Sequence, residues 1–308
     1  MNENYASEFD AIVEKAKAGG KPMRVAVAGA DVENILQGVF DAQEAGFVEP
    51  VLIGNYKHIQ SMLERLGLKD RKYDLQPVND DTNVVQYAIE LIQSGGADAL
   101  MRGNTQTRDF LMPILNKANH LLRDNGLLTH VVILKVPELP KLLAISDVTL
   151  LVETSMESRK KVVQNMTRAL KLFDVKTPNI ALLSLVEKAS FHMKDTVEAQ
   201  TIVMDHTETP IADCNLVGPI SYDLIVSKEA ARLKGYDCPY CGEFDGIVVP
   251  NLMTGNLLVK TLLINAKATG CGVLMGATIP IAISGRSDNK EQAFLSLATC
   301  AVMNQGSK

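Results

Sequence analysis

Short apolar runs alternate with amphipathic stretches along almost the whole chain. The apolar runs are nearly continuous, which is typical of parallel strands covered on both faces. The amphipathic stretches have helical spacing and often start at a residue that suits a helix N-cap. Strands are expected at residues 24–28, 51–54, 97–101, 130–134, 147–152, 180–185, 214–217, 246–249 and 272–275. Helices are expected at residues 31–45, 56–66, 83–93, 109–117, 155–173, 197–204 and 290–302.

This alternation of strands and helices predicts an α/β protein with helices on both faces of its sheets. About ten strands are more than one compact sheet of this kind usually holds. The pattern therefore favours two α/β/α lobes with mainly parallel sheets and an active-site cleft between them. We expect the first lobe to comprise residues 1–141 plus 286–308 and the second to comprise residues 142–285.

Composition narrows the class of protein. A chain of 308 residues with 46% hydrophobic and 22% charged residues is ordinary for a globular protein. A net charge of −5 and the absence of a Lys/Arg block argue against nucleic acid as a partner. The first residues lack the apolar core of a secretory signal, and no apolar run is long enough to span a membrane. Together with five scattered cysteines, this predicts a cytoplasmic protein with reduced thiols.

Turns at the carboxyl ends of parallel strands are where α/β proteins bind small anions. The first such turn is Met101–Thr107, in which Arg102 and Gly103 follow a strand and a helix begins soon after. A helix N-terminus with unpaired N–H groups suits a phosphate group. A plain N-cap beside an exposed arginine is the alternative interpretation.

The second turn, Pro250–Asn256, also follows a strand and opens a helix. Gly255 permits close backbone approach, and Asn251 and Asn256 can donate and accept hydrogen bonds. The third turn, Ser284–Asp288, brings Arg286 to the end of an apolar run, where arginine can bind phosphate with two parallel hydrogen bonds. A surface ion pair between Arg286 and Asp288 is the alternative there.

Two motifs suggest other chemistry. Cys238-Pro-Tyr-Cys241 has the spacing of a redox thiol pair, but it lies between a predicted helix and a strand, so no helix N-terminus activates it. A zinc site would need two more ligands, and the histidines are scattered. The glycines of Gly270–Gly276 bracket a strand instead of following one, so nicotinamide binding is not expected.

The stretches GPISYDLIVSKEAARLKG, VVPNLMTGNLLVK and GVLMGATIPIAISGRSD resemble the phosphate acetyl/butyryltransferase family, above all its phosphate butyryltransferase branch. LLSLVEKASFHM and ALMRGNTQT are weaker matches. The resemblance covers nearly the whole chain. It implies two α/β/α lobes like those of isocitrate and isopropylmalate dehydrogenases. It also implies direct transfer, in a ternary complex, of a butyryl or other short acyl group from acyl-CoA to phosphate, with phosphate acetyltransferase activity as the alternative.

The same resemblance implies a homodimer or higher homo-oligomer, no metal, and no permanently bound cofactor, because coenzyme A is a substrate or product. The resemblance, read together with the strand-end turns, predicts that the catalytic residues are Arg286, Ser284, Asp288 and Asn256. The predicted substrate-binding residues are Arg102, Gly103, Thr107, Asn251, Thr254, Gly255, Asp223 and Ser287.

The chain departs from the family pattern at several positions, including Asn251 in place of the aspartate of a Pro-Asp pair and Val217 in place of the aspartate of Asp-Gly-Pro. Gly285 stands where the family has the serine of a Ser-Arg pair, with Ser284 adjacent, and Gln292 stands where the acetyl branch has an aspartate. These departures motivate a second hypothesis, a catalytically weak acyl-CoA or acyl-phosphate binding protein of the same fold. A third hypothesis is a dehydrogenase-like enzyme of the same two-lobe fold, which would need a set of metal-binding aspartates and a nicotinamide cofactor.

Overall fold

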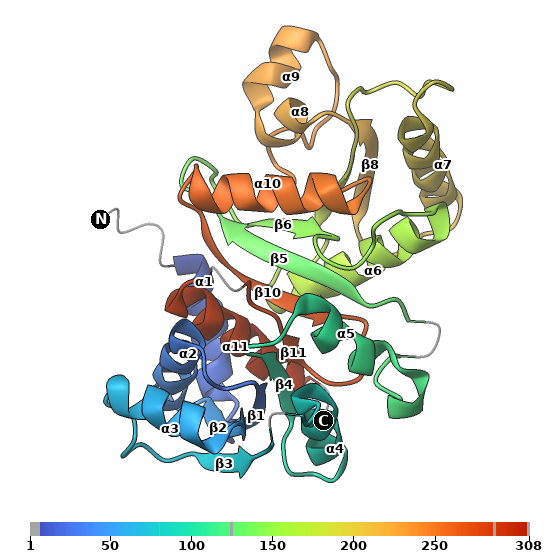
Figure 1. The fold of residues 1–308 in the computed structure, drawn as a ribbon. Helices are drawn as coiled ribbons and strands as arrows, with labels where there is room; N and C mark the ends of the chain where they lie inside the picture. The colour runs from blue at the N-terminus through green and yellow to red at the C-terminus, as the bar shows by residue number, and fades with distance from the viewer. Residues whose placement is uncertain (1–6, 80, 124–125, 286–287, 307–308) are drawn as a thin grey trace. The chain divides into compact units, whose positions relative to one another are not determined.

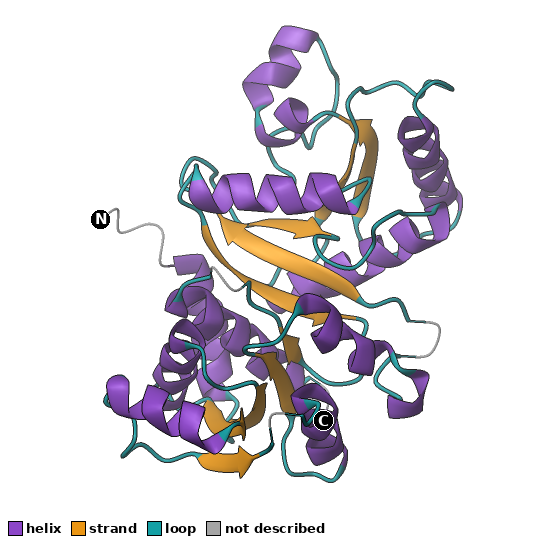
Figure 2. Cartoon of the chain, in the orientation of Figure 1, coloured by secondary structure: helices purple, strands orange, loops and turns teal. Residues whose placement is uncertain are grey.

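The computed structural model describes residues 7–79, 81–123, 126–285 and 288–306. The chain divides into two compact units. The first unit comprises Phe9–Leu128 and Gly270–Lys308, and the second comprises Thr129–Thr269 together with Met1–Glu8. Both units are mixed α/β structures with mainly parallel sheets and covering helices (Figures 1 and 2), so the predicted fold class is confirmed.

The boundaries between the units fall at 8/9, 128/129 and 269/270, whereas the predicted boundaries were at 141/142 and 285/286. Strand pairing explains the difference. β5 (Thr129–Lys135) pairs antiparallel with β6 (Leu143–Ser146), which holds both strands in the second unit. β11 (Ile281–Ala282) pairs with β10 (Thr269–Met275) and with β4 (Ala99–Arg102), so it belongs to the first unit.

The first unit contains a sheet with the strand order β3-β2-β1-β4-β11-β10, parallel except for the β10–β11 pair. Its remaining strands are β1 (Met23–Ala28), β2 (Val48–Gly54) and β3 (Asp74–Pro77). Its helices are α1 (Ser7–Ala18), α2 (Glu33–Glu44), α3 (Tyr56–Arg65), α4 (Val84–Gln93), α5 (Thr107–Leu115), the 3₁₀ turn η1 (Lys117–Asn119) and α11 (Lys290–Gln305). Helices α2 and α11 pack together, as do α4 and α5, and Figure 1 shows the two pairs on opposite sides of the strands.

The second unit contains strands in the order β5-β6-β9-β7-β8, parallel except for the β5–β6 pair. Its other strands are β7 (Asn179–Leu183), β8 (Asn215–Ile220) and β9 (Gly246–Val248). Its helices are α6 (Met156–Leu172), α7 (Lys194–Glu208), α8 (Tyr222–Val226), α9 (Lys228–Lys234) and α10 (Leu252–Ile264). Buried side chains of β5, β6, β7 and β9 form a core with α8, α9 and α10.

The strand expected at residues 147–152 was wrong, because β6 ends at Ser146 and an irregular segment follows. The cause is Asp147, whose carboxylate is almost fully buried. One of its oxygens accepts the backbone N–H groups of Thr149, Leu150 and Leu151, and the other accepts that of His130. This local capture bends the chain away from an extended conformation, in spite of its apolar residues.

Candidate functional site

In the first unit, three parallel strands end at one edge of the sheet and carry candidate anion-binding groups there. β4 pairs in parallel with β1 on one side and with β11 on the other. Met101 is the partner of Ala282 in this register, so Arg102 and Ser284 leave the sheet at the ends of neighbouring strands. The chain passes from β1 outward to β2 and β3 and then returns to β4. Such a reversal of strand order is where open α/β sheets bind ligands.

The turn after β4 is held tightly against the end of β1. The Gly103 N–H donates to the Ala28 carbonyl at 3.0 Å, and the Asn104 N–H donates to the Gly29 carbonyl at 2.7 Å. A Cβ atom at Gly103 would lie 2.1 Å from the Gly29 oxygen, closer than real contacts allow. Glycine is therefore required at position 103 for this close approach of two main chains.

Arg102 is buried, and its Nε and Nη2 atoms donate to the Thr105 carbonyl at 3.1 and 2.7 Å. This contact fixes the orientation of the guanidinium. Thr107, the first residue of α5, is partly exposed, and the backbone of Gln106 before it is extended. The turn thus combines an oriented arginine with a helix N-terminus, the pairing that favours a bound anion.

Two hydroxyl groups at this edge are shielded from solvent and have no hydrogen-bond partner among the described residues. They are Thr105 Oγ1, after β4, and Ser284 Oγ, after β11. Ser284 is only 4% exposed. Because buried polar groups are normally paired, two unpaired hydroxyls beside an arginine fit a site whose ligand supplies the missing oxygen atoms.

The turn after β11 is closed by Asp288. Its carboxylate accepts the Gly285 N–H at 2.6 Å, and the Asp288 N–H donates back to the Gly285 carbonyl at 3.0 Å. The predicted residues Arg286 and Ser287 lie outside the described residues. Gln292 forms a capping box with Asn289, each side chain accepting the other's backbone N–H at 2.9 Å, so it stabilises the start of α11.

In the second unit, the turn after β9 is organised by Asn251, the N-cap of α10. The Asn251 Oδ1 atom accepts both the backbone N–H and the hydroxyl of Thr254 at 3.0 Å, and its carbonyl accepts the Gly255 N–H at 3.2 Å. These amides are therefore already used within the turn. The Asn256 side chain donates to the Val148 carbonyl at 3.3 Å, and Asn256 itself is exposed.

Gly255, like Gly103, lies where two main chains approach too closely for a side chain. A Cβ atom at Gly255 would lie 2.5 Å from the Asp147 carbonyl oxygen and 2.9 Å from a methyl group of Val249. This close approach places the first turn of α10 directly on the segment that follows β6. Substitution would push the helix away from that backbone.

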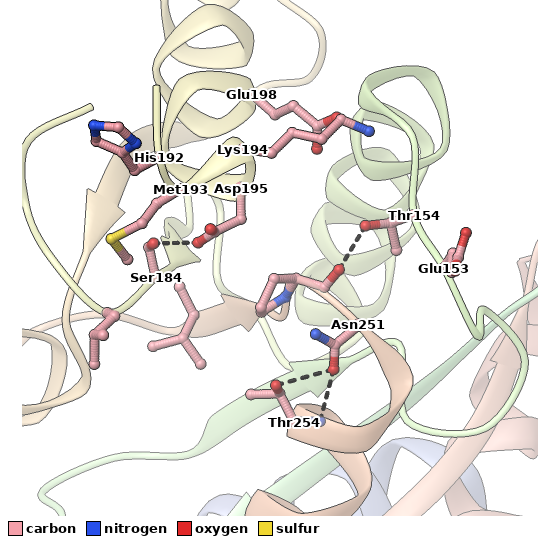
Figure 3. A pocket seen from close by; sticks show the side chains of 13 residues that line it. Glu153, Thr154, Ser184, His192, Met193, Lys194, Asp195, Glu198, Asn251 and Thr254 are labelled. Atoms are coloured by element: carbon pink, nitrogen blue, oxygen red, sulfur yellow. Dashed lines mark hydrogen bonds and ion pairs between the residues drawn. The ribbon is translucent and has the colours of Figure 1, made fainter. Parts of the chain in front are cut away.

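A cavity of about 810 Å³ opens beside this turn, at the carboxyl ends of β7 and β9. Its wall includes the predicted residues Asn251 and Thr254 together with side chains from the segments after β6 and β7 and from the start of α7. Figure 3 shows these side chains around the hollow. The polar lining residues that the sequence analysis did not single out are Glu153, Thr154, Ser184, His192, Lys194, Asp195 and Glu198.

The polar groups of this wall are cross-linked. The Ser184 hydroxyl donates to the Asp195 carboxylate, and the Thr154 hydroxyl donates to the Pro250 carbonyl at 2.6 Å. Lys194 forms an ion pair of 3.2 Å with Glu198 (Figure 3). Ser184 thereby connects the end of β7 to α7, and Thr154 fixes the backbone directly after β9. These bonds give the cavity a defined polar rim.

Behind Asp195 and Glu198 lies Arg159 of α6, which is fully buried. Its Nη1 atom donates to the Asp195 carbonyl at 3.3 Å and lies 3.9 Å from the Glu198 carboxylate. Its Nε and Nη2 atoms have no hydrogen-bond partner among the described residues. Burial lowers the pKa of Arg159, and the nearby charges of Glu198 and Asp195 oppose that shift.

Asp223 belongs to an ion-pair cluster at the end of β8. Its carboxylate accepts the Ser221 hydroxyl at 2.6 Å and pairs with the Lys234 ammonium at 3.0 Å, and Lys234 also contacts Glu187 at 3.1 Å. The hydroxyl of Ser221 and the charge of Lys234 lower the pKa of Asp223. Ser221 is the N-cap of α8, and Asp223 is a residue of its first turn that is paired with a cation.

The structure thus brings some predicted residues together within each unit. Arg102, Gly103, Ser284 and Asp288 share one sheet edge in the first unit, and Asn251, Thr254 and Gly255 share a turn in the second. A weak signal for the missed lining residues was present, because the family-like stretch LLSLVEKASFHM covers Leu182–Met193 and includes Ser184 and His192. Lys194, Asp195 and Glu198 follow it directly and look like an ordinary charged helix start.

No group of three or more His, Cys, Asp or Glu side chains lies close enough to bind a metal ion within the described residues. None of the helices in the described part of the chain is both long and apolar enough to cross a membrane.

These features define an α/β protein of two units whose strand-end turns offer arginine, hydroxyl groups and helix N-termini to anionic ligands. The sequence pattern of the family described as phosphate acetyl/butaryl transferase matches residues 73–301. The chain therefore belongs to this family, and the predicted resemblance is confirmed.

Relatives include both of the expected activities. The chain is 29% identical to a phosphate acetyltransferase of Thermotoga maritima, covering 96% of this chain and 99% of the relative. It is 28% identical to a phosphate butyryltransferase of Clostridium acetobutylicum, covering 96% and 97%. Its fold is similar to the crystal structure of a branched-chain phosphotransacylase from Enterococcus faecalis, with a TM-score of 0.77, 26% identity, and coverage of 92% of this chain and 98% of that one.

Proposed function

We propose that this enzyme transfers a butyryl or other short acyl group between coenzyme A and phosphate, by direct attack in a ternary complex. Acetyl transfer is the alternative within the same chemistry, because relatives of both kinds match this chain with nearly equal identity. The proposal includes coenzyme A as substrate or product and no permanently bound cofactor.

One observation carries the proposal: two buried hydroxyls without partners, Thr105 and Ser284, lie with Arg102 at one edge of the first unit's sheet. Phosphate offers several acceptor oxygens and a negative charge, which match two hydroxyl donors and a guanidinium. In this proposal Arg102 and Arg286 hold the phosphoryl group, with Thr107, Ser287 and the main chain at Gly103 beside them.

The second unit supplies the acyl-CoA contacts in this proposal. A volume of about 810 Å³ lies within the range of ~300–1,000 Å³ that is typical of small-molecule sites. Because the Thr254 and Gly255 amides are bound within their own turn, the contacts that this unit makes with the acyl carbonyl fall to the amides before them. Asn251, Asn256 and Asp223 supply polar contacts at the ends of β9 and β8.

Asp288 has a structural role as well as the catalytic one expected from the sequence. Its carboxylate accepts the Gly285 N–H and so fixes the main chain directly after Ser284. A dedicated base is of minor importance, since a thiol of pKa ~8.5 is about 3% ionised at pH 7 and its deprotonation costs only about 2 kcal/mol. Positioning two substrates can be worth ~7–11 kcal/mol, so the anion-binding groups outrank the base.

The test is an assay of CoA release from acetyl-, butyryl-, isobutyryl- and longer acyl-CoA with phosphate. We expect phosphate-dependent turnover with a preference for four- or five-carbon chains. Arg286→Ala should lower kcat/KM by tenfold or far more, because it removes a bidentate phosphate contact. Arg71→Ala is the matched control, because Arg71 forms an exposed ion pair with Glu44 and should leave kcat/KM unchanged. An equal kcat/KM for the two variants would remove Arg286 from the mechanism.

A catalytically weak acyl-CoA or acyl-phosphate binding protein is the second candidate. Gln292 favours it, because its side chain is committed to the capping box of α11 and offers no base. Tight binding of CoA with no phosphate-dependent turnover over the whole acyl panel would establish this candidate in place of the enzyme.

We also propose that the protein acts in the cytoplasm as a homodimer or higher homo-oligomer. Exposed apolar side chains on α10 support assembly: Met253, Leu257 and Ile264 are 77%, 65% and 64% exposed. Large apolar side chains that gather on one helix face often mark an interface. Light scattering should give a mass of at least two chains, and a monomer at micromolar concentration would contradict the proposal.

A further inference from the structure

The pair Cys238 and Cys241 lies in the second unit, in the connection from α9 to β9. The two residues are the first and last of a turn in which the Cys241 N–H donates to the Cys238 carbonyl at 3.3 Å. A turn of this kind keeps its end Cα atoms within about 7 Å. A disulfide needs Cα atoms roughly 4.4–6.8 Å apart, so the backbone is already arranged for one.

The side chains meet the remaining requirements. The Cys238 side chain lies close enough to the Cys241 thiol to raise its pKa, and both side chains project from the same hydrogen-bonded turn. Cys238 is partly exposed, whereas Cys241 is only 4% exposed and packs in the core with Phe244. A soluble reagent can therefore reach Cys238 first, and Cys241 is placed to react only with its neighbour.

Both ends of this turn are connected, through a few residues, to the ion pair between Lys234 and Asp223. Four residues before Cys238, Lys234 ends α9 and bonds to Asp223. Immediately after Cys241, the Gly242 N–H donates to the Leu224 and Ile225 carbonyls of α8, whose first turn carries Asp223, at 3.2 Å each. Both partners of the ion pair are thus connected to the turn through a few residues of chain.

We propose that Cys238 and Cys241 form a reversible disulfide with a small-molecule disulfide as oxidant, and that this bond acts as a covalent latch on α8 and α9. The Cys238 thiolate attacks one sulfur of oxidised glutathione, forming a mixed disulfide and releasing one glutathione thiolate. The Cys241 thiolate then attacks the Cys238 sulfur and releases the second. The two cysteines lose two electrons, one glutathione disulfide is reduced to two thiols, and those thiols take up the two cysteine protons.

The protein environment makes this a slow latch and not a catalytic redox centre. Burial, the adjacent Cys238 and Asp223 raise the pKa of Cys241 to about 11, so its thiolate is scarce at neutral pH. No helix begins at either cysteine, since the next element after the turn is β9. Catalytic thiol pairs depend on a lowered pKa, whereas the pKa of Cys241 is raised. The latch does not depend on the proposed acyl transfer, and it is tested without acyl-CoA.

The experiment incubates the whole protein with oxidised glutathione, quenches with acid, and measures the intact mass and the alkylated cysteines. The wild type should lose two hydrogen atoms, carry no glutathione, and become resistant to alkylation at Cys238 and Cys241, with recovery after dithiothreitol. Five alkylatable thiols after incubation, or a stable glutathione adduct on the wild type, would overturn the proposal.

Variants fix the order of attack. Cys241→Ser should retain one glutathione on Cys238, Cys238→Ser should retain none, and Cys214→Ser, a buried cysteine of the same unit, should still form the disulfide. An adduct on Cys241 in Cys238→Ser would contradict the entry through Cys238. Hydrogen exchange on the oxidised and reduced wild type tests the latch, with at least tenfold slower exchange in α8 and α9 expected after oxidation. Identical exchange in the two states would refute the latch.

Discussion

Replacement of Gly103 by alanine tests whether the turn after β4, where we propose that phosphate binds, depends on close contact between two main chains. The added Cβ atom would lie 2.1 Å from the Gly29 oxygen and 2.8 Å from the Ala28 oxygen. Ordinary van der Waals contact begins at 3.4 Å, so the turn after β4 must move by about 1 Å. This movement also stretches the two hydrogen bonds that Gly103 and Asn104 donate to the end of β1.

The expected loss in the free energy of unfolding follows from these contacts. Overpacking typically costs ~1–3 kcal/mol, and a weakened backbone hydrogen bond adds about 1 kcal/mol, so we expect Gly103→Ala to lower the free energy of unfolding by roughly 2–4 kcal/mol. This corresponds to a Tm lower by roughly 5–15 °C. A misplacement of about 1 Å at a substrate-positioning group can cost 10²-fold, so kcat/KM should fall by about that factor.

Gly67→Ala is the matched control for this variant. Gly67 has a positive φ of 68°, and an added Cβ atom there would meet no atom within 4 Å. The variant should cost ~1–2 kcal/mol through backbone conformation alone and leave kcat/KM unchanged. Calorimetry gives the stabilities, and the CoA-release assay gives the rates. A wild-type Tm for Gly103→Ala, or a kcat/KM within threefold of the Gly67→Ala value, would contradict this role of Gly103.

Three further variants test other parts of the structure. Ser284→Ala removes a buried hydroxyl without a partner, so the free energy of unfolding should change by less than about 1 kcal/mol while kcat/KM falls about 10²-fold; an unchanged rate would exclude Ser284 from the site. Asp147→Ala leaves four backbone N–H groups without their carboxylate and should cost more than about 3 kcal/mol in urea unfolding, whereas a loss below 1 kcal/mol would contradict this role. Arg159→Met removes a buried guanidinium, two of whose nitrogens have no hydrogen-bond partner among the described residues. The Tm should therefore stay constant or rise, because Glu198 keeps Lys194 as its ion-pair partner. A Tm lower by more than about 6 °C would show that Arg159 stabilises the fold.

The strand and helix alternation could be predicted from the sequence because apolar runs such as those in β1 and β5 are buried along their whole length. Strand direction could not be predicted, since the local pattern of β5 and β10 is the same for parallel and antiparallel pairing. β3, with the sequence DLQP, lies at the sheet edge and is partly exposed, so it lacks the apolar signal. At residues 147–152 a single buried carboxylate outweighed the apolar pattern.

The candidate site could be predicted where chemistry follows a strand directly, as in the turns at Arg102 and Asn251. It could not be predicted where a polar residue is placed by tertiary packing. Arg159 stands in the sequence SRKK, which looks like a solvated helix face, yet its side chain is fully buried behind Asp195. Only the packing of α6 against the sheet and α7 reveals this position.

The two units use the same device at their candidate sites. In each, a glycine brings its main chain against a carbonyl oxygen at a neighbouring strand end: Gly103, directly after β4, against Gly29, and Gly255, in the first turn of α10, against Asp147. Neither glycine has a positive φ, so turn conformation alone does not explain them. Both positions lack room for a side chain, because two main chains are in contact there. This contact fixes the position of α5 and of α10, each relative to the strands of its own unit. Main-chain placement to within a fraction of an ångström, more than any single side chain, therefore sets how these turns can meet a ligand.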